Sequence, residues 1–183
     1  MVFTADVGNT NIVLSAYDND TRLFSSRIQT EANKTSDQYA IAFNSILHLN
    51  GISTKGFDGA IISCVVPPLQ TTLRNAVQKL LGCHALIIGP GIKTGLNIKI
   101  DNPAILGSDL VCGAVAAIKK YKPPIIVFDL GTATKISAID KFGSFLERIL
   151  LSLVNLLVSC QIFLSVLHTM PPPQRPCFWR CRQ

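Results

Sequence analysis

Charge is scarce in this chain: only 15% of its 183 residues are Asp, Glu, Lys or Arg, and only 7% are aromatic. Hydrophobic residues make up 48% of the sequence. A chain of this composition can bury enough apolar surface to offset the entropy of ordering, so intrinsic disorder is excluded. The length suits one well-buried domain, or two small domains that share an interface.

The sequence also lacks a strong concentration of positive charge, although its formal net charge is +6. Residues 1–146 carry 13 Lys and Arg against 10 Asp and Glu, and residues 147–183 carry four Arg against one Glu. The cluster of Lys119, Lys120 and Lys122 is typical of the solvated end of a helix. We therefore expect no nucleic-acid partner.

The first residues contain neither the basic segment nor the apolar run of a secretory leader, which favours the reducing cytoplasm. In that compartment the six cysteines are expected to be thiols. Cys64, Cys83 and Cys112 each lie singly in an apolar run, as buried thiols do. Cys177 and Cys181 have too few potential ligands nearby to predict a zinc site.

The first fifty residues change from strand-like to helix-like patterning. β-rich runs separated by polar turns predict an antiparallel meander of three strands, at residues 2–7, 12–17 and 22–28. Helical spacing then predicts an amphipathic helix over residues 36–49, capped by Ser36 and stopped by Gly51.

Further along, strands and helices alternate, which indicates parallel strands joined by crossover connections. The predicted elements are a strand at 59–66, a helix at 69–81, a strand at 83–88, an extended piece at 96–100, a helix from about 104 to 121, and strands at 125–129 and 136–139.

The clearest clue is an internal repeat. Asp6-Val7-Gly8-Asn9-Thr10-Asn11 and Asp129-Leu130-Gly131-Thr132-Ala133-Thr134 each join two strands through Asp-x-Gly and small polar residues. Glycine lets the backbone approach phosphate oxygens, Thr and Asn donate hydrogen bonds, and Asp can hold a hydrated cation. For one copy alone, an ordinary hairpin turn is the favoured interpretation. Two copies predict a triphosphate held between two hairpins.

This arrangement resembles the duplicated phosphate-binding hairpins of the superfamily of sugar kinases, heat-shock 70 ATPases and actin. Within it, the sequence resembles type III pantothenate kinase. The resemblance covers residues 1 to about 146 and is carried by the two repeat copies and by Ile62-Ser63-Cys64-Val65-Val66-Pro67-Pro68, Lys93-Thr94-Gly95-Leu96, Asp101-Asn102-Pro103 and Gly107-Ser108-Asp109. It implies an α/β fold with a mixed sheet: one ribonuclease H-like (actin-like ATPase) domain and the first strands of a second.

The resemblance also implies residue roles. Asp109 would be the general base that accepts the proton of the substrate hydroxyl, Asp6 would help to place Mg²⁺, and Asp129 would ligate a monovalent cation, K⁺ or NH₄⁺. The implied ATP contacts are Asp6, Val7, Gly8, Asn9, Thr10, Asn11, Ile12, Val13 and Thr132. The implied pantothenate contacts are Ile100, Gly107, Ser108, Asp109 and Leu110. By itself, Asp109 is better explained as a polar residue of a first helical turn. An Asp that ends a strand, as Asp129 does, is frequently only a turn former.

The chain departs from the family pattern at three positions. Leu110 stands where many members have an Arg that pairs with the pantothenate carboxylate, and Lys93 or Lys99 could replace that charge. Ile100 stands where many have a stacking Tyr, and Lys135 stands where Thr is usual.

Residues 147–183 contain no Gly, Lys or Asp, an abrupt change in composition. We expect a first domain at residues 1–121, the start of a second at 122–146 with two strands, and a non-family apolar tail at 147–183, which a frameshift would explain. Residues 149–167 have the length of a marginal membrane span, but a poorly packed apolar helix is the favoured interpretation.

The resemblance implies ATP-dependent phosphorylation of pantothenate, the first step of coenzyme A synthesis, by a cytoplasmic homodimer. Two alternatives stay open. One is an inactive remnant or regulatory binding module of the same family, and the other is a small membrane-associated protein defined by its tail.

Overall fold

The computed structural model describes residues 1–103, 106–130 and 134–151, and its chain forms two compact units. The N-terminal unit comprises Met1–Ile92 and Gly107–Asp109. The C-terminal unit comprises the described residues of Lys93–Leu106 and those that follow from Leu110 to Leu151. These units group residues by contact, so the predicted domain boundaries at residues 121 and 146 stay predictions.

The N-terminal unit is built on one mixed sheet of five strands in the order β3-β2-β1-β4-β5. The strands are β1 (Val2–Val7), β2 (Asn11–Asp18), β3 (Thr21–Gln29), β4 (Gly59–Cys64) and β5 (Ala85–Ile87). β1, β2 and β3 form the predicted antiparallel meander, and β4 pairs in parallel with both β1 and β5. The predicted α/β fold class with a mixed, ribonuclease H-like sheet is confirmed.

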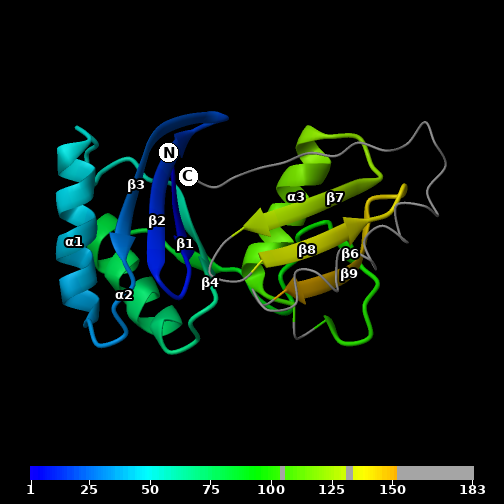
Figure 1. Ribbon diagram of the computed structural model, residues 1–183. Helices are drawn as coiled ribbons and strands as arrows, with labels where there is room; N and C mark the ends of the chain where they lie inside the picture. Colours follow the sequence, from blue (N-terminus) through cyan, green and yellow to red (C-terminus); the bar gives the residue numbers. More distant parts are fainter. Residues whose placement is uncertain (104–105, 131–133, 152–183) are drawn as a thin grey trace. The chain divides into compact units, whose positions relative to one another are not determined.

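Two helices, α1 (Ser36–Leu49) and α2 (Leu69–Leu81), connect the strands and cover the same face of this sheet (Figure 1). Both agree with the predicted helices to the residue, because their apolar side chains recur at helical spacing. The core residues that they share with β1 are Phe3, Ala5, Val7, Tyr39, Phe43, Leu47, Leu69, Leu73, Ala76 and Val77. Since strand side chains alternate between faces, Asp6 must lie on the opposite face of the sheet.

The C-terminal unit contains a second sheet, with the order β6-β9-β8-β7. Its elements are β6 (Asn97–Ile98), α3 (Ser108–Lys120), β7 (Ile125–Leu130), β8 (Thr134–Ile139) and β9 (Ser144–Leu151), with the first two residues of α3 grouped in the N-terminal unit. β7, β8 and β9 are antiparallel neighbours, and β6 joins β9 in parallel. Ala114 of α3 packs with Ile125, Ile139 and Phe145 to form the core.

The expectation of only two strands in this region was wrong. The turn after β8 returns the chain along the sheet: Gly143 adopts a positive φ of 79°, and the Ser144 amide donates to Asp140 Oδ1 at 2.8 Å. β9 therefore continues to Leu151, beyond the predicted family boundary at residue 146.

The start of the third predicted helix was also wrong. We expected it to begin near residue 104, but α3 begins at Ser108. Leu106 is instead held in a turn, because its amide donates to the Pro103 carbonyl at 3.2 Å, and Gly107 then separates this turn from the helix. Ala104 lies outside the described residues.

No helix within the described parts of the chain is long and apolar enough to cross a membrane. The first three residues of the apolar segment 149–167 belong to β9, and its other residues lie outside the described part of the chain. Cys177 and Cys181 lie outside it as well.

The cap of α1 is Thr35 and not the predicted Ser36. The Gln38 amide donates to Thr35 Oγ1, and the Thr35 amide donates to Gln38 Oε1 at 2.8 Å, which completes a capping box. We predict that Thr35→Ala lowers the free energy of unfolding by about 1 kcal/mol, because an amide of the first turn loses its partner. The matched control Ser36→Ala should change it much less. Urea unfolding followed by circular dichroism measures both, and equal effects would contradict the assignment.

Candidate active site

The first Asp-x-Gly hairpin lies between β1 and β2 and is closed by its own backbone. The Gly8 amide donates to the Asn11 carbonyl at 2.9 Å. A Cβ atom at Gly8 would lie 3.2 Å from that same carbonyl oxygen, so any side chain there would crowd the turn. Asn9, Thr10 and Asn11 are exposed, whereas Val7 and Ile12 have no exposed surface. Val7 and Ile12 can therefore offer a ligand only backbone groups.

Thr30 holds this hairpin in place and was not predicted from the sequence. Its Oγ1 donates to the Gly8 carbonyl at 2.8 Å, and its amide donates to the Thr10 carbonyl at 2.9 Å. Thr30 directly follows β3, and only the pairing register of β2 with β3 brings it beside the turn. No sequence motif marks it. The geometry of the exposed turn thus depends on a residue about twenty positions further along the chain.

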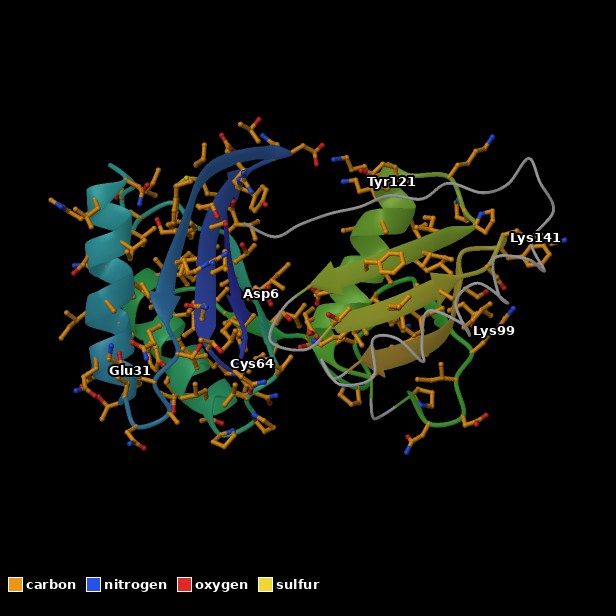
Figure 2. The ribbon with its side chains drawn as sticks, in the orientation of Figure 1. Asp6, Glu31, Cys64, Lys99, Tyr121 and Lys141 are labelled. Atoms are coloured by element: carbon orange, nitrogen blue, oxygen red, sulfur yellow. The ribbon has the colours of Figure 1, made fainter. Side chains whose placement is uncertain are left out.

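On the face of the sheet opposite to α1 and α2, Asp6 of β1 lies directly beside Ser63 of β4 in the parallel register. Figure 2 labels Asp6 on this strand. Ser63 Oγ donates to Ser108 Oγ at 3.1 Å, and both serines are nearly fully buried, at 6% and 8% exposure. The start of α3 is therefore fixed to the sheet next to Asp6, which brings Gly107, Ser108 and Asp109 into the same unit as the first hairpin.

The carboxylate of Asp109 folds back over Gly107. A Cβ atom built on Gly107 would lie only 2.6 Å from Asp109 Oδ1, which no real contact permits. A side chain at residue 107 would therefore displace this carboxylate. Asp109 also lies in the first turn of α3, where the partial positive charge of the helix end favours an anionic side chain.

The other predicted substrate residues belong to the C-terminal unit. Leu110 is 6% exposed, and Ile100 packs against the core of that unit. Of the lysines proposed to replace the missing Arg, Lys93 is exposed, whereas Lys99 Nζ donates to Asp140 Oδ2 at 3.2 Å.

Asp140 holds Lys99 as part of a wider set of contacts. The amide of Ser144 is the main cause that keeps the pKa of the Asp140 carboxyl below its ordinary value, and Lys99 and the Phe142 amide add to the effect. Asp140 is consequently ionised near neutral pH, which makes Lys99 a poorer partner for a substrate carboxylate.

In the second hairpin, Asp129 of β7 lies opposite Lys135 of β8, and Lys135 Nζ is 3.9 Å from Asp129 Oδ2. Thr132, the predicted ATP contact of this hairpin, lies outside the described residues.

Cys64 is buried at the end of β4, as predicted, whereas Cys83 and Cys112 are half-buried. Burial is the main cause that raises the pKa of the Cys64 thiol, so it is protonated at neutral pH. The thiol therefore behaves as a small apolar side chain and not as a nucleophile.

Comparison with known proteins gives a consistent result. The family model described as type III pantothenate kinase matches residues 2–152. A type III pantothenate kinase of Geobacillus sp. (strain WCH70) is 44% identical over 146 residues, which cover 80% of this chain and 57% of that protein. The chain belongs to the type III pantothenate kinase family, and it spans little more than half the length of this relative.

Solved structures with similar chains include the ethanolamine utilization protein EutJ from Carboxydothermus hydrogenoformans. The two chains share 18% identity with a TM-score of 0.44, and the similarity covers 88% of this chain and 56% of the other. ROK hexokinase from Thermus thermophilus shares 12% identity with a TM-score of 0.45, over 79% of this chain and 47% of the other.

Gly107→Ala tests whether the position of the Asp109 carboxylate matters. The added methyl group must displace this carboxylate, so we predict a fall in kcat of about 100-fold with little change in melting temperature. The matched control is Gly113→Ala within α3, where a Cβ meets nothing within 4 Å and should leave kcat unchanged. Steady-state kinetics with thermal melting measures both, and an unchanged kcat in Gly107→Ala would contradict the assignment.

Proposed function

We propose that this protein phosphorylates pantothenate with ATP to give 4′-phosphopantothenate, the first step of coenzyme A synthesis. Family membership over residues 2–152 supports this function. The observation that carries it is the hydrogen bond from Ser63 to Ser108, because it joins the start of α3, with Asp109, to the sheet face that bears Asp6.

The first hairpin would hold the phosphates of ATP. Exposed Asn9, Thr10 and Asn11 can donate hydrogen bonds to phosphate oxygens, and Gly8 leaves its backbone open to close approach. The half-buried carboxylate of Asp6 offers the oxygen ligand that Mg²⁺ prefers, directly or through water. These residues therefore fit a Mg²⁺–ATP complex, in which the ion supplies charge neutralisation at the phosphates.

Asp109 would act as the general base. In phosphoryl transfer the enzyme chiefly positions groups and balances charge. The carboxylate would align the primary hydroxyl of pantothenate and accept its proton as the oxygen attacks the γ-phosphorus and the bond to ADP breaks. Gly107 would leave room for that carboxylate, and Ser108, Leu110 and Ile100 would be further contacts of pantothenate.

The second hairpin does not fit the monovalent cation that the family resemblance implies. The carboxylate of Asp129 already faces the ammonium of Lys135 at 3.9 Å, so its charge is balanced within the chain. We assign no step of the reaction to a bound K⁺ or NH₄⁺. The contact of Thr132 with ATP remains part of the proposal.

We further propose that the enzyme works as a homodimer in the cytoplasm, where ATP and pantothenate are in solution. Sedimentation of the purified protein tests the dimer.

A second candidate is a binding module of the same family that holds ligand without turnover. Two observations favour it: Leu110 is buried and uncharged, and Lys99 is engaged by Asp140. The carboxylate of pantothenate would then lack a charged partner. Binding of ATP in a calorimetric titration, together with no ADP formation in the presence of pantothenate, would support this candidate.

A coupled assay for ADP tests the kinase. With Mg²⁺–ATP we expect ADP to form only when pantothenate is present. Asp109→Asn should lower kcat by about 10² to 10⁴-fold, because the amide cannot accept the proton. The matched control Asp37→Asn removes an exposed carboxylate of α1, paired with Lys79, and should keep full activity.

Release of ADP without pantothenate would contradict the proposed substrate. A folded Asp109→Asn variant with full activity would contradict the role of Asp109.

A further inference from the structure

The two Asp-x-Gly hairpins differ in what faces the aspartate. In each hairpin the Asp is the next-to-last residue of the first strand. Opposite Asp6 in the antiparallel register stands Val13, whereas opposite Asp129 stands Lys135. Because directly opposed side chains share one face of a sheet, the second hairpin brings a positive charge to its own Asp, whereas the residue directly opposite Asp6 is uncharged.

The pair in the second hairpin is partly removed from solvent. Lys135 Nζ lies 3.9 Å from Asp129 Oδ2, and the two side chains are only 23% and 30% exposed. Strand alternation places both on the face that carries the core residues Ile125, Val127 and Ile139. Charges in such surroundings interact more strongly than on an open surface.

An ammonium group matches the ion that this carboxylate would otherwise take. Lys carries a compact single positive charge with three hydrogen-bond donors, chemically an alkylated NH₄⁺. A second monovalent cation at the same carboxylate would meet this ammonium at close range and be repelled. The site is therefore poorly suited to bind K⁺ from solution.

We propose that the ammonium of Lys135 is a built-in monovalent cation at Asp129, so that the protein needs neither K⁺ nor NH₄⁺. The expected effect on the reaction rate rests on the proposed kinase function. The occupation of the cation site by Lys135 does not depend on turnover. It makes Lys135 a positioning residue that fixes the charge of the second hairpin.

The test compares two salts of equal ionic strength, KCl and tetramethylammonium chloride, with ATP supplied as its Tris salt. Native protein is compared with Lys135→Thr and with Lys135→Gln, which keeps a long side chain without charge. Lys141→Thr, which removes an exposed lysine from the turn before β9, is the control. Each protein is examined for pantothenate-dependent ADP formation and for melting temperature.

We expect the native protein and Lys141→Thr to give the same rate and melting temperature in both salts. Both Lys135 variants should lose about tenfold or more of the rate in tetramethylammonium and recover it in KCl. Their melting temperatures should rise with KCl, because an ion that binds the folded state stabilises it.

The proposal would be overturned if KCl raised the rate or the melting temperature of the native protein as much as it raised those of the Lys135 variants. It would also be overturned if KCl did not change the melting temperatures of the Lys135 variants. If the native protein forms no ADP in either salt, the proposed kinase function fails. The melting temperatures then still decide whether Lys135 fills the cation site.

Discussion

The candidate site depends on one buried hydrogen bond, between the hydroxyls of Ser63 and Ser108. It joins the end of β4 to the start of α3, 45 residues later in the chain, on the sheet face that bears Asp6. Two buried hydroxyls that satisfy each other are stable, whereas either one alone would bear the cost of its desolvation. The pairing therefore selects where α3 begins, and with it the position of Asp109.

The chain uses one structural device twice. In each antiparallel meander, β1–β2–β3 and β7–β8–β9, the next-to-last residue of the first strand is the Asp of an Asp-x-Gly sequence. The residues opposite the two aspartates nevertheless differ in charge: uncharged Val13 stands opposite Asp6, whereas Lys135 stands opposite Asp129. The two hairpins thus share a backbone arrangement but differ in the charge of the residue opposite the aspartate.

The sequence predicted the elements whose signal is local. α1, α2 and β1 match the predicted ranges because their apolar residues recur at a period of 3.6 or 2. The features that the sequence did not predict depend on tertiary contacts. Thr30 reaches the Gly8 turn only through strand register, and β9 forms because the Asp140 turn returns it to β8. The residues of the candidate site were predicted from family resemblance, whereas the hydrogen bond between Ser63 and Ser108 required the structure.

The claim that ATP phosphates bind at the Gly8 turn beside the start of α3 is tested most directly by amide chemical shifts of isotope-labelled protein, titrated with Mg²⁺–ATP and then with pantothenate. The nucleotide should shift the amides of Gly8, Asn9 and Thr10 most strongly, and pantothenate should shift those of Ser108 and Asp109. Saturating nucleotide that leaves the turn unchanged, or that shifts only α1 and α2, would contradict it.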